Sequence, residues 1–193
     1  MGPDADGDGV GDVVMGMSPV LGAPGDARCV QLLSGADGHP LWAAPFCRPS
    51  MRAPQSVSLG SDVNGDGRAD VAVGTAHPPE GDAPVVILSG ADGAVLRRVA
   101  APPDAEGFGA SVALGGDVDG DRQPDLVACA SASLHVFDAA SGERRGGIRF
   151  AASAGVQPRA QVIPALLADS SAAVLVATGA EGLRVYTRAG GGP

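Results

Sequence analysis

Aromatic residues, lysine and long apolar runs are scarce or missing in this sequence. Phenylalanine, tryptophan and tyrosine make up 3% of its 193 residues, so a core must be built mainly from valine, leucine and alanine. All thirteen basic residues are arginine, and the formal net charge is -9. An acidic chain without a basic stripe lacks the electrostatic footprint of a nucleic-acid-binding protein. No apolar run reaches the roughly 18 residues of a membrane span, so neither nucleic acid nor a membrane span is expected.

Cysteine is also sparse, at three residues. Cys29, Cys47 and Cys129 are too few for a disulfide-rich scaffold, and none lies in a Cys-x-x-Cys pair. Cys29 and Cys47 flank a predicted hairpin and could pair in a secreted protein; buried free thiols are the alternative. The segment Met1–Asp4 has neither the basic nor the apolar region of a signal peptide, so no signal peptide is visible.

Catalytic motifs are missing as well. The sequence contains no Gly-x-Ser-x-Gly elbow and no His-Glu-x-x-His motif. Its three histidines, His39, His77 and His135, lie in no recognisable catalytic pattern. The sequence therefore predicts a protein that is not an enzyme.

Glycine and proline, by contrast, are plentiful, at 30 and 16 residues. This level approaches that of disordered chains. However, 45% of the residues are hydrophobic, and many lie in short valine- and leucine-rich runs. Short apolar runs separated by turn residues are typical of all-β structure.

The central motif is the stretch 62–74, which reads DVNGDGRADVAVG. Oxygen-bearing side chains stand at positions 1, 3, 5 and 9 of this loop: Asp62, Asn64, Asp66 and Asp70. Such a density of carboxylates is relieved by a hard cation such as Ca²⁺, which takes six to eight oxygen ligands. Position 7, Arg68, would add its backbone carbonyl.

An EF-hand is excluded for this loop. An EF-hand requires a glutamate at position 12 and a helix on each side. Position 12 is Val73, and the flanks 56–59 and 70–74 read as short strands. The sequence therefore predicts a calcium loop between two strands.

The same pattern occurs three times. Loops start at Asp4, at Asp62, 58 residues later, and at Asp117, a further 55 residues on. A strand that runs into a turn repeats in phase at 30–38 and 85–93, and more loosely at 134–142. Each such turn indicates a hairpin, so one period contains about four strands. A fourth period is degenerate: only Asp169 remains of its ligands, and no calcium is expected there.

The stretch 108–121, FGASVALGGDVDGD, resembles the FG-GAP repeat of integrin α-subunit propellers and related bacterial proteins. The resemblance extends over almost the whole chain. It implies a β-propeller in which calcium loops connect the first two strands of certain blades. It also implies about three Ca²⁺ ions, with the ligands carried over by position from the loop at 62. They are Asp4, Asp6, Asp8, Val10 and Asp12; Asp62, Asn64, Asp66, Arg68 and Asp70; and Asp117, Asp119, Asp121, Gln123 and Asp125. Position 6 of the third loop is Arg122 in place of glycine, so this site is expected to be the weakest.

We therefore predict an all-β fold, a propeller-type array of about four four-stranded blades that is incomplete at both ends. The expected blades are residues 1–50, 51–104, 105–155 and 156–187, and 188–193 form a tail. The chain is expected to be a piece of a larger propeller, with seven blades implied by the resemblance. A four-bladed ring, or open edges that pair with the rest of the propeller or with a second copy, remain alternatives.

For function, the resemblance implies a calcium-binding module for binding or adhesion in a surface or secreted protein. The alternative is a carbohydrate-binding accessory domain of a secreted polysaccharide lyase or hydrolase. The calcium is expected to be structural, and direct contact between the metal and a ligand is the alternative. A minor alternative, a pyrroloquinoline-quinone propeller, rests on the stretch 33–42 with its single Trp42. The ligand, a protein or carbohydrate, is expected on the connections 75–83 and 101–107.

Overall fold

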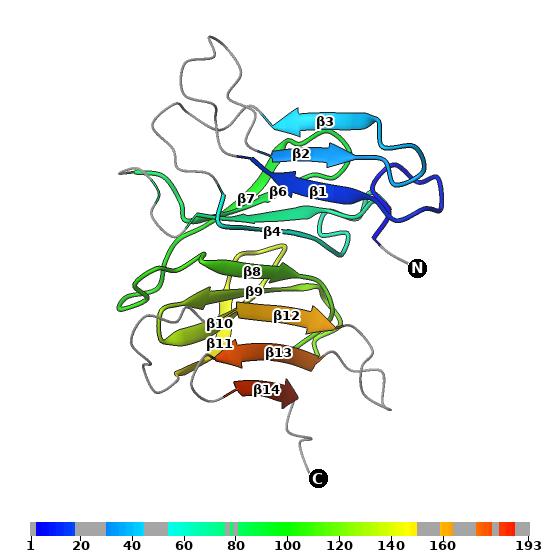
Figure 1. Cartoon of the computed structure of the whole chain (residues 1–193). Coiled ribbons are helices and arrows are strands. Elements are labelled where there is room, and N and C mark those ends of the chain that lie inside the picture. The colour runs from blue at the N-terminus through cyan, green and yellow to red at the C-terminus, as the bar shows by residue number, and fades with distance from the viewer. Residues whose placement is uncertain are drawn as a thin grey trace.

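The computed structural model describes residues 3–17, 30–44, 54–75, 78 and 81–149, and the backbone of strands at 159–163, 173–178 and 182–187. All regular structure in these residues is strand, in four antiparallel sheets (Figure 1). The prediction of an all-β fold is confirmed.

Consecutive strands form each sheet. The first sheet contains β1 (Val13–Gly16), β2 (Val30–Leu33) and β3 (Pro40–Ala44). The second contains β4 (Ser56–Leu59), β5 (Val71–Gly74), β6 (Val85–Leu88) and β7 (Val95–Val99). The third contains β8 (Ser111–Leu114), β9 (Asp125–Ala130), β10 (Ser133–Asp138) and β11 (Arg144–Arg149). The fourth contains β12 (Arg159–Ile163), β13 (Ala173–Thr178) and β14 (Gly182–Thr187).

The sheets stack face to face. Strand β4 contacts β1 on one side and β8 on the other, and β12 contacts β8. This succession of three- and four-stranded meanders, with their first strands adjacent, is the arrangement of propeller blades. The exact blade limits given above stay a prediction.

Strand β5 shows why the repeats read as continuous apolar runs. Val71 and Val73 pack in a cluster with the first sheet, while Ala72 packs in a cluster with the third. Successive side chains of a strand point to opposite faces, and both faces of this sheet are covered. All four residues of β5 are therefore buried.

The second and third acidic loops each connect two neighbouring strands of one sheet. The loop at 62–70 joins β4 to β5, whose register pairs Leu59 with Val71. The loop at 117–125 joins β8 to β9, and the loop at 4–12 precedes β1. The antiparallel pairing thus closes the second and third loops at their bases.

Cys29, Cys47 and His77 lie outside the described residues. The pairing of Cys29 with Cys47 and the placement of His77 therefore stay predictions. Cys129 is buried as a free thiol.

Candidate metal centres

The three acidic loops share one hydrogen-bond pattern. The position-1 carboxylate accepts the backbone N–H groups of positions 4 and 6. In the first loop Asp4 accepts from Gly7 at 2.6 Å and Gly9 at 2.8 Å. In the second, Asp62 accepts from Gly65 at 2.6 Å and Gly67 at 2.7 Å. Glycines at these positions have φ values of 80–86°, which L-residues rarely adopt.

Positions 3 and 5 each accept one N–H from two residues ahead. The N–H of Asp8 donates to Asp6 at 3.0 Å, and that of Val10 donates to Asp8 at 2.7 Å. In the second loop the N–H of Asp66 donates to Asn64 at 3.0 Å, and that of Arg68 donates to Asp66 at 2.9 Å. These turns fix one oxygen of each side chain and orient the other.

The position-9 carboxylates lie at the base of their loops. Asp70 is fully buried and accepts N–H groups from Val63 at 2.7 Å and Gly90 at 2.9 Å. Asp12 accepts likewise from Ala5 at 2.7 Å and Gly35 at 2.9 Å. Position 9 therefore ties each of the first two loops to the next hairpin of its own sheet, a role that the ligand spacing did not indicate.

Carboxylate oxygens converge in the loops where all three positions are aspartate. Asp4, Asp6 and Asp8 each place an oxygen within 4.8 Å of the others, as do Asp117, Asp119 and Asp121. Asp12 and Asp125 are not members of these groups. Grouped carboxylates suit a hard divalent cation, so the donor chemistry of the first loop fits Ca²⁺. The second loop offers two carboxylates, Asp62 and Asp66, and the amide oxygen of Asn64, which are also oxygen donors.

Burial and hydrogen bonds shift the pKa values of these groups. The pKa of Asp4 is lowered, first by the N–H bond from Gly9 and then by that from Gly7. Burial raises the pKa of Asp70, and it raises the pKa of Asp125 to about 6. A bound cation would oppose this effect of burial, because positive charge favours the ionised carboxylate.

The first two loops also contact each other. The backbone N–H of Ala69 donates to the carbonyl of Asp4 at 2.9 Å, and the Arg68 guanidinium donates to the carbonyl of Ala5 at 3.1 Å. Trp42 on β3 extends to the second sheet, where its ring N–H donates to the Gly90 carbonyl at 2.6 Å. The loops therefore lie at a contact between sheets.

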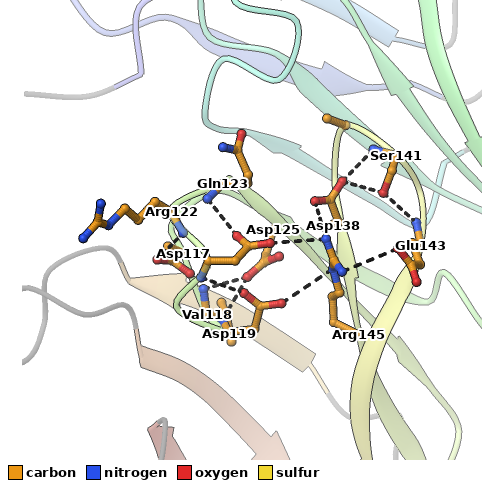
Figure 2. Close-up of polar contacts among 12 residues, drawn as sticks. Asp117, Val118, Asp119, Arg122, Gln123, Asp125, Asp138, Ser141, Glu143 and Arg145 are labelled. Atoms are coloured by element: carbon orange, nitrogen blue, oxygen red, sulfur yellow. Dashed lines mark hydrogen bonds and ion pairs between the residues drawn. The ribbon is translucent and has the colours of Figure 1, made fainter.

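The third loop differs from the other two. Arg122 replaces glycine at position 6 and has a φ of 72°, which is the strained backbone that the sequence predicted. The guanidinium of Arg145, on β11, lies against Asp119, Asp121, Asp138 and Glu143 (Figure 2). Sequence reasoning missed Arg145 and Asp138. Aligning the third hairpin with the first two would have found them, because those hairpins carry leucine and serine there.

The two connections expected to bind a ligand lie side by side. Pro78 and residues 81–84 of the first connection, and Ala100, Ala101, Ala105, Gly107 and Phe108 at the second, line one open hollow of ≈ 590 Å³. Apart from Asp82, its lining consists of proline, glycine, alanine and Phe108. The structure therefore brings together two segments about 20 residues apart in the sequence.

His135 is a core residue. Its ring packs edge-on against Phe108, with centroids 5.8 Å apart. Its Nδ1 accepts from the Arg144 guanidinium at 3.2 Å, and Nε2 lies 2.9 Å from the Ser133 hydroxyl. Its pKa is lowered, first by burial and then by the positive charges of Arg144 and Arg149.

The buried imidazole predicts a loss of stability in acid. The folded pKa lies below the ordinary value of about 6.5, so the unfolded chain binds the proton more readily. The contribution of His135 is therefore complete above pH 6.5 and is lost as the pH falls toward the folded pKa. We expect the free energy of unfolding, measured in urea at fixed Ca²⁺, to decrease less between pH 7.5 and 5 in His135→Gln than in the wild type. His39→Gln is the control, because the exposed His39 has a raised pKa through Asp37 and should not lessen this decrease. An unchanged pH profile in His135→Gln would contradict the assignment.

Among the residues that the structure describes, no helix has the length and apolar character needed to cross a membrane.

Comparison with known proteins agrees with the loop geometry. Residues 62–128, which contain the second and third loops, match the FG-GAP-like repeat model. Integrin alpha-PS2 of Drosophila melanogaster is 29% identical over an alignment that covers 69% of this chain and 11% of that protein. The chain thus spans about a tenth of the length of this curated relative.

Among solved structures, the computationally designed Ika8 protein matches 83% of this chain and 53% of its own, with a TM-score of 0.35 and 13% identity. BBS1N, from its complex with ARL6DN, matches 92% of this chain and 65% of its own, with a TM-score of 0.37 and 13% identity. The family-model match thus identifies an FG-GAP-like repeat at residues 62–128, and the recurring loop geometry and the successive antiparallel sheets agree with it.

Proposed function

We propose that this chain is a calcium-stabilised binding module, in which Ca²⁺ holds the first two acidic loops against the sheets. The observation that carries this proposal is the shared loop geometry. In both loops backbone N–H groups of the same loop hold the side chains at positions 1, 3 and 5, and in the first loop the three carboxylates converge within 4.8 Å. The FG-GAP-like match across the second loop supports the same role.

The metal serves structure in this proposal. Both loops lie where the first and second sheets meet, because Asp4 and Ala5 bond to Ala69 and Arg68. A cation that binds only the folded protein stabilises it by mass action. Removing calcium should therefore loosen the contact between these sheets.

The module binds its partner without catalysis. The similarity to integrin alpha-PS2 supports a role in adhesion or binding at a cell surface or outside the cell. The hollow lined by Pro78, residues 81–84 and the connection after β7 is the proposed contact surface, and a protein or carbohydrate is the proposed partner. The two calcium loops, at 4–12 and 62–70, and this surface are formed by different connections of the chain.

Direct calcium binding tests the proposal. We expect isothermal titration calorimetry to detect Ca²⁺ binding by the wild type and the loss of one ion in the double variant Asp62→Asn, Asp66→Asn. Neutral amides are weaker ligands and leave no carboxylate among positions 1, 3 and 5 of this loop. Glu106→Gln is the control, since it removes one exposed carboxylate outside the loops. Equal binding by the wild type and the double variant would rule out the second loop as a site.

A further inference from the structure

Three of the positions at which the hairpin after the third loop differs from its two counterparts lie close to that loop. The strand registers pair Leu33 with Pro40, Leu88 with Val95, and Phe137 with Arg144. The residue after the second member of each pair is Leu41, Leu96 or Arg145. By the same alignment, Asp138 stands where the others have Ser34 and Ser89, and Ala139 stands where they have Gly35 and Gly90.

Arg145 brings positive charge to a position that is apolar in the other sheets. Leu41 and Leu96 are half-buried and pack against the cores of their sheets. The Arg145 guanidinium instead lies 3.0 Å from Asp138 Oδ2 and 3.2 Å from Asp121 Oδ2. It also lies 3.7 Å from Asp119 Oδ2 and 3.5 Å from Glu143 Oε2. It therefore contacts two of the three carboxylates that converge in the third loop (Figure 2).

Asp138 holds the Arg145 guanidinium in place. Its side chain is 7% exposed, and its Oδ1 accepts two bonds of 2.6 Å from the backbone and hydroxyl of Ser141. Its other oxygen accepts from Arg145 at 3.0 Å. A buried carboxylate needs an opposite charge or several donors, so Asp138 and Arg145 form one unit that the other hairpins lack.

Ala139, the third of these differences, removes a hydrogen bond from the base of the third loop. A Cβ at Gly35 or Gly90 would lie 1.8 Å from the carbonyl oxygen of Gly11 or Ala69. With alanine in this place, the Ala139 N–H donates to the carbonyl of Pro124 at 3.0 Å. Asp125 Oδ1, whose counterparts accept from Gly35 and Gly90, is buried with no hydrogen-bond partner in the described part of the chain.

We propose that Arg145 provides the counter-charge of the third loop in place of a bound cation, so that this loop keeps its shape without calcium. The positive guanidinium partly neutralises the negative charge of the Asp119 and Asp121 carboxylates, and it repels a divalent cation that approaches them. The chain then has two calcium-dependent loops and one calcium-independent loop. This inference rests on the proposed function for the first two loops only.

Replacing the unit with the residues of the other hairpins tests the inference. We expect calorimetry to count two Ca²⁺ ions on the wild type and three on Asp138→Ser, Arg145→Leu, with affinity at the third loop raised at least tenfold. Arg145→Lys retains the charge and should bind two ions. Arg98→Gln, which removes an exposed arginine from β7, should also bind two.

A second experiment tests the role of Arg145 in the absence of metal. In EDTA, Arg145→Gln should lower the melting temperature by several degrees more than Arg98→Gln does, because Asp119, Asp121 and the buried Asp138 lose the guanidinium with which they form ion pairs. Added Ca²⁺ should recover part of that loss.

The outcomes separate this inference from the proposed function. Three ions of similar affinity on the wild type, or two on both the wild type and the double variant, would overturn the role of Arg145 and leave the calcium loops standing. One ion on the double variant and none on the wild type would support Arg145 and overturn calcium in the first two loops. No binding by either protein would overturn both. Equal melting temperatures for Arg145→Gln and Arg98→Gln in EDTA would also count against Arg145.

Discussion

Replacing Phe108 with alanine is expected to lower the free energy of unfolding by about 4 kcal/mol, the usual cost of removing a large buried ring. Phe108 is 2% exposed and belongs to the cluster between the second and third sheets. Its ring also lies edge-on to Phe137, with centroids 5.7 Å apart. Truncation leaves a cavity where two sheets meet. Because the chain has few aromatic residues, few large side chains are present that could move into this cavity.

Urea unfolding at fixed Ca²⁺ measures this effect. Phe108→Leu is the matched control, because it keeps most of the apolar volume and should cost less than half as much. A loss below 1 kcal/mol in Phe108→Ala would show that the contact between these sheets contributes little to stability.

Replacing Gly90 with alanine should cost about 3 kcal/mol, since it combines overpacking with the loss of a hydrogen bond to a carboxylate. The new Cβ would lie 1.8 Å from the carbonyl oxygen of Ala69, which is backbone and cannot rotate away. To relieve this clash, the hairpin that contains Gly90 must move away from the second loop. Asp70 then loses the hydrogen bond that it accepts from the Gly90 N–H, which is 2.9 Å long in the wild type. Calcium affinity of the second loop should fall with the stability.

Gly146→Ala is the control for this substitution. A Cβ at Gly146 meets no atom within 4 Å, and its φ is not positive, so the stability should stay within about 0.5 kcal/mol of the wild type. Equal effects of the two substitutions would contradict the close approach at Gly90. The third sheet already shows the consequence, since it has Ala139 at this position and its Asp125 lacks the corresponding bond.

The all-β fold and its sheets followed from the sequence because both signals are local. Runs such as 71–73 and 85–88 are bounded by turn residues and recur in phase with the acidic loops. In the described part of the chain the four sheets have three, four, four and three strands. Alternating acceptors likewise predicted which side chains converge, because backbone N–H groups within the same loop hold them in place.

The remaining features of the candidate site depend on residues outside the loops. Asp70 reads as one more ligand, yet it bonds to Gly90, 20 residues away on the next hairpin. Arg145 lies 24 residues from Asp121 and reaches it only because β10 and β11 fold back beside the loop. Spacing within a loop carries no information on such contacts. Comparison of the three hairpins does, because leucine, leucine and arginine at one aligned position indicate a change of environment.

Calcium removal is expected to have its largest structural effect at the contact between the first two loops. One hydrogen bond from Ala69 and one from Arg68 join these loops. Under the proposal a cation bound in either loop would also stabilise the neighbouring loop, and loss of calcium should affect both sheets together.

A thermal melt in excess EDTA, followed by melts with added Ca²⁺ or Mg²⁺, tests the calcium proposal most directly. The account predicts a rise in melting temperature of many degrees with Ca²⁺ and a much smaller rise with Mg²⁺, which requires tighter octahedral geometry. A protein that melts cooperatively at the same temperature in EDTA and in Ca²⁺ would contradict it, and the acidic loops would then be solvated turns held by their own hydrogen bonds.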